Sequence, residues 1–302
     1  MKVLQCGYPK SGNYFLYNNL HSIMECTGQT FQTKISKLAS EELIGSVPLS
    51  NSQQANIDWI EFDTHRLFLG LGSVLKVPIT ETLGDYLEND HLVWSHSNAN
   101  STMKSHLSDF DKVVYIYRDP RSILVSKAHA GLQDYGKVHY PSPGKTPTDV
   151  AVNALGNILM HWSIHLLSWA TTNGDILFVN YTDLKNDKIS TLKQIISYLG
   201  LELTDEQLAI IAQNTSLENM QKKEGSDVHV RTGSDVEWKN VLPMWVQIIS
   251  YLVSYLPLKI IRLRERGRLN PYALFLTKSL IWIFKILASV RAFMRYWKSF
   301  LV

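Results

Sequence analysis

The sequence predicts an α/β fold in which helices flank a parallel β-sheet, and three observations carry this prediction. Short apolar, β-branched runs recur along the chain, segments with helical spacing or capping residues separate most of them, and polar motifs follow the ends of several runs. Alternating strand and helix signals are typical of a parallel sheet covered on both faces, with ligands at the carboxyl ends of the strands. The expected strands lie at residues 3–6, 59–62, 92–94, 113–117 and 176–179.

Length and composition indicate a globular protein. The chain has 302 residues, of which 45% are hydrophobic and 19% are charged, enough for one large α/β domain or two smaller ones. Its two cysteines, Cys6 and Cys26, give no framework for a disulfide-rich secreted fold or a cysteine-based zinc site. No signal-peptide pattern precedes the first expected strand, so we expect the catalytic body to stay in the cytoplasm.

The first strand leads into a glycine-containing loop and then a helix. Residues 7–16 read Gly-Tyr-Pro-Lys-Ser-Gly-Asn-Tyr-Phe-Leu. Backbone N–H groups at a helix N-terminus attract anions such as phosphate or sulfate, and Lys10 adds a full positive charge. The lysine precedes the last glycine, so the loop does not match the common GxxxxGK[ST] phosphate-binding pattern. Alone, the motif could also be a plain strand-to-helix turn.

Two further polar motifs occur later in the chain. Arg118 ends the strand expected at 113–117, Pro120 suits the first turn of a helix, and Ser126 lies two helical turns further on. Arg118 and Ser126 could therefore converge on one anion, although an arginine at a strand end more often forms a surface ion pair. Residues 231–240 form a polar, glycine-containing loop with Arg231 and Trp238, which alone indicates only a turn.

Together these motifs resemble the sulfotransferases that use 3′-phosphoadenosine 5′-phosphosulfate (PAPS), over roughly residues 1–240. The loop at residues 8–12 resembles the family's 5′-phosphosulfate loop, and Arg118 with Ser126 matches its 3′-phosphate motif. Trp162, His165 and Trp169 reproduce the family's W-x-x-H-x-x-x-W helix. Other matching segments begin at Tyr181 (Tyr-Thr-Asp-Leu-Lys), Tyr198 (Tyr-Leu-Gly-Leu), Thr215 (Thr-Ser-Leu-Glu-Asn-Met) and Arg231 (Arg-Thr-Gly, then Trp-Lys-Asn). The resemblance implies a P-loop NTPase-like fold.

The resemblance also implies which residues bind the donor, without a metal. The 5′-phosphosulfate would be held by Lys10, Ser11, Gly12, Asn13 and Tyr14. The 3′-phosphate would be held by Arg118, Ser126, Arg231, Thr232 and Gly233. The adenine would be held by Phe15, Tyr181, Thr215, Leu217 and Met220. The second phosphate distinguishes PAPS from ATP.

The expected reaction is in-line transfer of a sulfuryl group to a hydroxyl or amine. Lys10 would neutralise charge on the departing phosphate oxygen. A base must take the acceptor's proton, and imidazole has a suitable unperturbed pKa of about 6.5. His96 resembles the histidine of the family's Lys-Thr-His motif and is the predicted base, with His129 as the fallback. His165 is better explained as a helix-packing residue.

The chain departs from the family pattern at several positions. Asn13, Tyr14 and Phe15 replace paired threonines and a tryptophan, Trp94 replaces the lysine of Lys-Thr-His, and Thr232 replaces a lysine. The segment between Thr215 and Arg231 is shorter than in the common cytosolic members. These changes predict an open pocket for a bulky acceptor, and leave a non-catalytic PAPS-binding relative as an alternative.

The charge distribution predicts two regions, a sulfotransferase domain at 1–240 and a basic, helical tail at 241–302. The tail contains ten lysines and arginines and one acid, a net charge of +9, so the body carries −6 of the total of +3. Residues 241–258 are uncharged, but Pro243, Gln247 and Pro257 interrupt them, which disfavours a membrane-spanning helix. Residues 271–302 mix aromatic, aliphatic and basic side chains, as in a helix lying in an anionic membrane interface. The alternative is helices packed on the domain or on a partner in a homodimer.

The predicted function is thus a PAPS-dependent sulfotransferase with a small-molecule acceptor, for which the tail suggests a lipid or glycolipid, and a peripheral position on the cytoplasmic membrane face. The alternatives are a P-loop kinase or hydrolase, which lacks the Gly-Lys-Ser/Thr metal-binding pattern here, and a membrane-bound scaffold. Nucleic-acid binding is disfavoured, because the cations of the tail alternate with large aliphatic residues and no nucleic-acid-binding motif is present.

Overall fold

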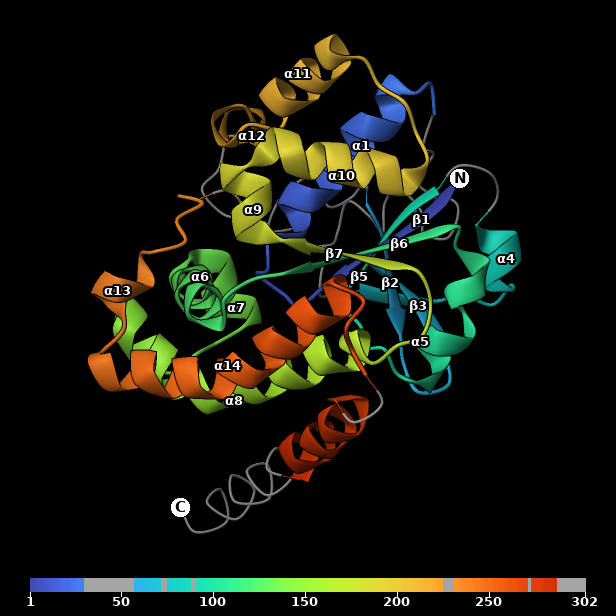
Figure 1. The fold of residues 1–302 in the computed structure, drawn as a ribbon. Helices are drawn as coiled ribbons and strands as arrows, with labels where there is room; N and C mark the ends of the chain where they lie inside the picture. The colour runs from blue at the N-terminus through green and yellow to red at the C-terminus, as the bar shows by residue number, and fades with distance from the viewer. Residues whose placement is uncertain (30–56, 72–74, 88–90, 225–230, 271–272, 287–302) are drawn as a thin grey trace. The chain divides into compact units, whose positions relative to one another are not determined.

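The computed structural model describes residues 1–29, 57–71, 75–87, 91–224, 231–270 and 273–286 (Figure 1). It divides into two compact units, each built from two stretches of chain. The first unit comprises Met1–Arg118 and Gly174–Asp235, and the second comprises Asp119–Asn173 and Val236–Val302.

The first unit contains a seven-stranded sheet. In spatial order its strands are β4 (Leu75–Pro78), β3 (Leu67–Leu71), β2 (Asp58–Phe62), β5 (His91–Ser95), β1 (Lys2–Gly7), β6 (Lys112–Tyr117) and β7 (Ile176–Asn180). The pairs β2–β5, β5–β1, β1–β6 and β6–β7 are parallel, whereas β2–β3 and β3–β4 are antiparallel. The predicted α/β fold and all five predicted strands are confirmed. The antiparallel edge formed by β3 and β4 is an addition to the parallel sheet that the sequence predicted.

Helices cover the sheet of this unit and complete its core. They are α1 (Asn13–Cys26), α4 (Leu83–Tyr86), α5 (Ser101–Ser105), a 3₁₀ turn (Leu107–Asp109), α9 (Tyr181–Asn186), α10 (Lys188–Leu199), α11 (Asp205–Asn214) and α12 (Leu217–Glu224). Helix α1 lies against β1 and β5, helix α10 lies against the edge strand β7, and α11 packs on both helices. Their apolar side chains, such as Leu20, Ile23 and Ile195, form one buried cluster with Val3 and Val114 of the sheet. This packing holds the loop between β1 and α1 on a rigid base.

The second unit is helical. It contains α6 (Pro120–Leu132), α7 (Asp134–His139), α8 (Pro147–Ala170), α13 (Trp238–Val241), α14 (Met244–Glu265) and a further helix at residues 273–286. Helix α8 contacts both α6 and α14 (Figure 1). Its Trp162, His165 and Trp169 are buried, which agrees with a packing role for His165.

Helix α14 belongs to the same compact unit as α8, although the predicted domain boundary lies before it, at residue 240. The two helices contact each other, and the face of α14 that contains Ser250 and Ser254 is buried. Small side chains allow two helices to approach closely. This part of the tail therefore packs within the second unit, and the predicted division at residue 240 stays a prediction.

Candidate active site

The loop after β1 turns through a strained residue. The Ser11 N–H donates to the Tyr8 carbonyl at 3.0 Å, so residues 8–11 close a tight turn with Pro9 at its second position. Lys10 follows with φ of 69°, and it is the one non-glycine residue with positive φ in the described parts of the chain. Backbone strain of this kind costs roughly 1–3 kcal/mol and is concentrated at functional sites. The strained residue of this turn is therefore the same lysine that the sequence predicted to contact the donor.

Gly12 and Asn13 fix the transition from this turn to α1. Gly12 has φ of 94°, a left-handed conformation that residues with a side chain rarely adopt. A Cβ at this position would also lie 2.2 Å from Cδ2 of Tyr181, so only glycine fits here. The Asn13 side-chain amide donates to the Tyr8 carbonyl at 2.8 Å, and the Asn13 backbone carbonyl accepts from the Gln5 side chain at 2.8 Å. Asn13 thus ties the loop to β1, a role that the sequence did not predict.

The loop also contains a buried hydroxyl. The Ser11 Oγ atom has no hydrogen-bond partner among the described residues, and its side chain is fully buried. It stands just before the N-terminus of α1, where the first N–H groups of a helix need an acceptor. Buried polar groups are normally satisfied, so an exception at a helix N-terminus is a place where an anion would complete the hydrogen bonding.

His96 follows β5, next to β1 in the sheet. Its Nδ1 lies 2.7 Å from the Gly7 carbonyl oxygen, which can only accept a hydrogen bond. The geometry therefore assigns the hydrogen to Nδ1, and in the neutral ring this leaves the lone pair on Nε2. The rings of Trp59 and Trp94 meet the imidazole edge to face, with centroids 5.9 and 5.4 Å away. His96 is thus held in one orientation by a carbonyl and two indoles.

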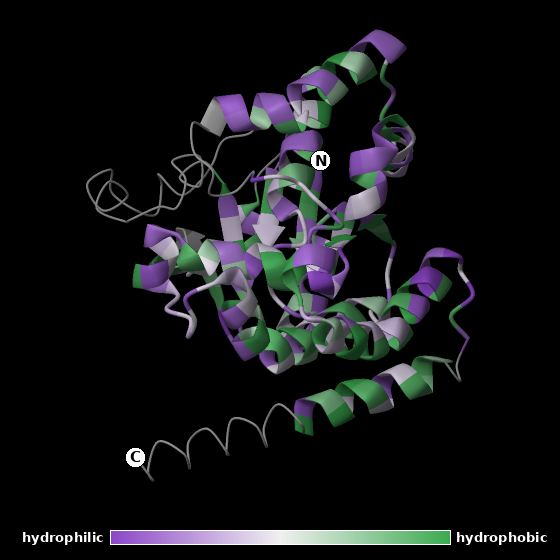
Figure 2. Cartoon of the chain, turned by 90° about the vertical axis from the view of Figure 1, so that its left-hand side faces the viewer, coloured by the Kyte–Doolittle hydropathy of each residue, from purple (hydrophilic) through white to green (hydrophobic). Residues whose placement is uncertain are grey.

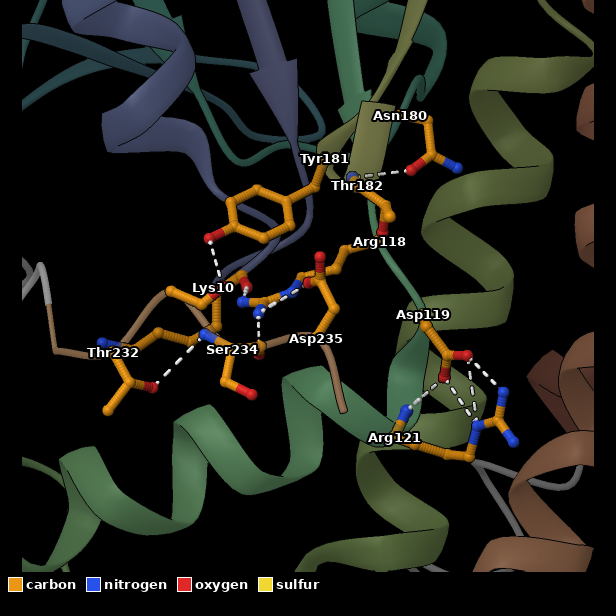
Figure 3. Close-up of polar contacts among 11 residues, drawn as sticks. Lys10, Arg118, Asp119, Arg121, Asn180, Tyr181, Thr182, Thr232, Ser234 and Asp235 are labelled. Atoms are coloured by element: carbon orange, nitrogen blue, oxygen red, sulfur yellow. Dashed lines mark hydrogen bonds and ion pairs between the residues drawn. The ribbon is translucent and has the colours of Figure 1, made fainter. Parts of the chain in front are cut away.

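Arg118 follows β6, the neighbour of β1 on its other side (Figure 3). Its guanidinium stacks on the Tyr181 ring, 4.0 Å from the centroid. Its Nη2 donates to the Ser234 carbonyl at 2.7 Å and to Asp235 Oδ1 at 3.2 Å, while its Nη1 lies 3.5 Å from the Lys10 carbonyl. Its Nε–H is buried without a hydrogen-bond partner among the described residues. Arg118 therefore links the loop after β1 to the segment at 231–235.

That segment lies against α9 and α12. Gly233 has φ of 58°, and its carbonyl accepts from the Tyr181 hydroxyl at 3.3 Å. A Cβ on Gly233 would lie 3.4 Å from both the Leu217 side chain and that hydroxyl. The Thr232 hydroxyl accepts from the Ser234 N–H at 3.3 Å, and the carbonyl of Arg231 accepts from the Gln221 side chain. Burial raises the pKa of Tyr181, and Arg118 partly offsets this.

The residues predicted to bind adenine are also gathered in the first unit. Phe15 meets Tyr181 edge to face with centroids 6.0 Å apart, and Met220 is buried nearby on α12. Thr215 is 2% exposed, and its hydroxyl lies 2.8 Å from Asn19 Oδ1 and 2.7 Å from the Ile211 carbonyl. Thr215 is thus engaged within the protein, and a contact of its hydroxyl with adenine stays a prediction.

Sequence analysis missed two charged residues at this site. Lys188 lies 5.0 Å above the Phe15 ring and donates to the carbonyls of Ala212 and Thr215. Asp235 forms the ion pair with Arg118. Neither was singled out, because a lysine after a Tyr-Thr-Asp-Leu-Lys segment and an aspartate in a polar loop look like ordinary surface residues.

Ser126 and His129 lie in the second unit, on α6. The His129 ring lies 3.2 Å from a carboxylate oxygen of Glu237, which places this fallback base in an ion-pair contact. Arg121 holds α6 to α13, because its guanidinium stacks 3.9 Å from the Trp238 centroid while it binds Asp119 through both carboxylate oxygens (Figure 3). Convergence of Ser126 with Arg118 on one anion stays a prediction.

Comparisons with known proteins bear on the family and the fold. A family model described as "Sulfotransferase domain" matches residues 1–246. Sulfotransferase 2A1 of Mus musculus is 26% identical over 250 residues, which are 77% of this chain and 75% of that protein. Flavonol 4′-sulfotransferase of Flaveria chlorifolia is 24% identical over 260 residues, 79% of this chain and 73% of that protein.

Solved structures share the fold. Mouse sulfotransferase SULT7A1 complexed with PAP superposes with a TM-score of 0.56 at 19% identity, over 87% of this chain and 88% of that one. Retinol dehydratase in a complex with retinol and PAP gives a TM-score of 0.55 at 16% identity, over 85% and 81%. Neither the kinase nor the scaffold alternative finds support in these comparisons. Since the family model spans most of the sequence, the chain belongs to the sulfotransferase family.

Proposed function

We propose that the loop after β1 and the arginine after β6 hold the two ends of a doubly phosphorylated nucleotide. The observation that carries this proposal is a pair of buried polar groups, Ser11 Oγ and Arg118 Nε, at the carboxyl ends of adjacent strands, neither of which has a hydrogen-bond partner in the part of the chain that the structure describes. Ligands of α/β sheets bind at this edge. As a sulfotransferase, the chain transfers a sulfuryl group from PAPS to an acceptor, and PAPS carries one phosphate at each end of its adenosine.

The residues present fit this donor. The 5′-phosphosulfate would lie against Lys10, Ser11, Gly12, Asn13 and Tyr14, where the α1 N-terminus favours an anion. The 3′-phosphate would lie against Arg118, Ser126, Arg231, Thr232 and Gly233. The adenine would lie among Phe15, Tyr181, Thr215, Leu217 and Met220. When bound, PAPS supplies the sulfuryl group and a phosphate leaving group.

The chain's own residues would then manage charge and protons. Lys10 would neutralise the charge that develops on the leaving phosphate oxygen, because it lies in the loop that leads into the N-terminus of α1. His96 takes the proton from the acceptor hydroxyl or amine at Nε2, because Nδ1 is committed to the Gly7 carbonyl. The imidazolium that forms keeps its Nδ1–H bonded to that carbonyl, which stabilises the charge.

His96 is tested with the variant His96→Ala in the full chain. We expect turnover to fall by a factor of at least about 100, as for loss of a general base. Binding of 3′-phosphoadenosine 5′-phosphate (PAP), measured by thermal stabilisation without Mg²⁺, should be retained, since a ligand at a hundred times its Kd adds about 2.7 kcal/mol. ADP, which lacks the 3′-phosphate, should stabilise the protein less.

His129→Ala is the matched control, because it removes the fallback base and should leave most of the turnover. Retained turnover in His96→Ala with loss in His129→Ala would reassign the base. Stabilisation by ADP but not by PAP would contradict the assignment of the nucleotide site itself.

We further propose that the acceptor is a small, lipid-soluble molecule, with lipids and glycolipids as the class to screen. The retinol dehydratase structures hold retinol and androsterone, both lipid-soluble alcohols. In this chain Trp59 and Trp94 flank the candidate base, and the Tyr14 ring lies 6.5 Å from the Trp94 ring. Such rings favour an apolar acceptor.

An exposed apolar face on α14 supports docking on an anionic membrane surface. Eight large apolar side chains on this helix are each at least 40% exposed: Met244, Trp245, Ile248, Ile249, Tyr251, Leu252, Tyr255 and Leu256. Hydrophobic residues also predominate along the helix at 273–286 (Figure 2). By length and composition α14 could cross a membrane, but its opposite face is buried against protein. We therefore propose that residues 241–302 lie on the membrane, with the enzyme on its cytoplasmic side, which vesicle cosedimentation can measure.

A further inference from the structure

The guanidinium that would bind the 3′-phosphate already holds a carboxylate. Arg118 Nη2 lies 3.2 Å from Asp235 Oδ1, and the two side chains are only 8% and 15% exposed. The same nitrogen donates to the Ser234 carbonyl at 2.7 Å, and the Tyr181 ring covers one face of the guanidinium. Asp235 therefore competes directly for the arginine that the proposed function assigns to the phosphate (Figure 3).

A phosphate and this carboxylate cannot share the arginine without electrostatic cost. An anion bonded to Arg118 must lie within a few ångströms of Asp235, because both contact one planar group. Like charges at such separations repel strongly where water is largely excluded. Either the carboxylate swings away when the phosphate binds, or it stays and weakens the contact.

The segment that carries Asp235 has other anchors. The Ser234 carbonyl is bonded to Arg118, the Gly233 carbonyl is bonded to the Tyr181 hydroxyl, and the Arg231 carbonyl is bonded to the Gln221 side chain. These bonds involve the backbone and do not need the Asp235 carboxylate. Its loss should therefore leave the segment in place.

We propose that Asp235 lowers the affinity of the site for nucleotides with a 3′-phosphate, by occupying Arg118 whenever the phosphate is absent. This inference rests on the proposed function of the site. The carboxylate acts as an internal competitor that is displaced on binding and returns when the bisphosphate product leaves. Asp235 leaves the affinity for nucleotides without a 3′-phosphate unchanged, because these nucleotides have no phosphate that binds the Arg118 guanidinium.

The opposite effect is expected if the ion pair is a structural clamp. In that case Asp235 holds the segment in its binding shape, and its loss weakens all nucleotides together. The sign of the change in PAP affinity, relative to that of a nucleotide without the 3′-phosphate, separates the two explanations.

The test compares Asp235→Asn with the wild-type chain by calorimetric titration of PAP and AMP. Asparagine keeps the size and a hydrogen-bond acceptor but removes the charge. We expect PAP to bind about tenfold more tightly and AMP to bind as before, since an unscreened charge contact of this kind is worth a factor of ten or more. Asp235→Ser is a second variant, and Glu202→Gln is a control that removes an exposed carboxylate elsewhere.

Each outcome decides the inference. A rise in PAP affinity relative to AMP in both Asp235 variants supports it, and so does PAP binding that appears only in the variants. Unchanged or weaker PAP binding in variants with an unchanged thermal midpoint overturns it, while wild-type PAP binding keeps the proposed function. Failure of the wild-type chain and both variants to bind PAP overturns the proposed function and the inference together.

Discussion

At the scale of single residues, the nucleotide site depends on charges that are partly removed from water. Lys188 is the clearest case outside the loop. Its ammonium group donates to the Ala212 carbonyl at 3.1 Å and to the Thr215 carbonyl at 2.7 Å, where α11 ends. A cation at the C-terminus of a helix is favourable. Burial nevertheless lowers the pKa of Lys188 from 10.5 to about 8.

This shift predicts a pH dependence of stability. In the unfolded chain Lys188 keeps its ordinary pKa, so between pH 8 and 10.5 the unfolded state holds a proton that the folded state has lost. The cost of burying the charge is fully present below pH 8 and is relieved as the pH rises through this window. Relative to Lys188→Met, the wild-type free energy of unfolding should therefore rise from pH 7.5 to 9.5.

Urea denaturation of both proteins at the two pH values measures this difference. The slope should stay below the limit of about 1.4 kcal/mol per pH unit for one proton, because solvent screens a partly exposed lysine. Contributions of the cysteines and tyrosines cancel, since both proteins contain them. Parallel pH profiles for the two proteins would show that Lys188 is not buried as a cation.

Residue-level contacts were the part of the site that sequence reasoning could predict least. Lys10, Gly12, Arg118 and Tyr181 were identified from motifs whose spacing within the chain is short, and the structure brings them together. The partner of Arg118 was not identified, because Asp235 is 117 residues away in the sequence and no local pattern links the two. A pairing that the fold alone creates has no signature in sequence spacing.

At the scale of elements, α14 shows an unusual division between its two faces. Its buried face contains Ser250 and Ser254, whereas its exposed face carries large apolar residues such as Trp245 and Leu252. In a helix that faces water the reverse is expected. The packed face also contains the buried apolar residues Val246, Ile260 and Ile261, and the two small serines between them allow close contact with the rest of the second unit.

This packing predicts opposite responses on the two faces. Ser250→Leu should lower the free energy of unfolding by about 1–3 kcal/mol, because the site is fully buried and an added side chain overpacks it. Leu252→Ser on the exposed face should change it by less than about 0.5 kcal/mol. Chemical denaturation monitored by circular dichroism measures both. Equal, small effects would mean that α14 is not packed along Ser250.

Ser250→Ala provides a finer control. The Ser250 hydroxyl is buried without a hydrogen-bond partner among the described residues, so its removal should not destabilise the protein. A loss of stability comparable to that of Ser250→Leu would point to an interaction of the hydroxyl rather than to steric packing.

The elements themselves were largely predictable. Each of the five predicted strands is an apolar run long enough to be buried, and burial of such runs determines the parallel part of the sheet. Strands β3 and β4 were not predicted, because β3 contains Gly70 and β4 has only four residues and ends at Pro78. Their hairpin pairing supplies stability that local propensity does not indicate.

At the scale of the whole molecule, charge and hydrophobic surface are concentrated in the same part of the chain. The last 62 residues carry a net charge of +9, and the exposed face of α14 is uncharged as far as residue 258. The exposed cations follow directly, at Lys259, Arg262, Arg266, Arg268, Lys278 and Lys285. A second copy of the chain would bring the same positive charge to this face, whereas an anionic lipid surface complements it.

Cosedimentation of the full chain with vesicles tests this surface. Vesicles that contain phosphatidylserine should bind the wild-type chain more tightly than vesicles of phosphatidylcholine alone, and added salt should weaken the difference. The double variant Lys259→Gln, Arg262→Gln should bind anionic vesicles about thirtyfold less well, since each cation near the surface contributes about 1 kcal/mol. Trp245→Ser with Leu252→Ser should weaken binding to both kinds of vesicle, because it removes apolar contact rather than charge.

Val138→Ser, which removes a more exposed apolar side chain from α7, is the control and should bind as the wild type does. If the charge and apolar variants bind vesicles like the wild type, the membrane is not the partner of this face. Sedimentation without vesicles then tests whether a second copy of the chain covers this face, since a homodimer through α14 would dissociate in the Trp245 and Leu252 double variant. Loss of vesicle binding in a protein that stays monomeric, with unchanged PAP affinity, would separate the docking surface from the nucleotide site.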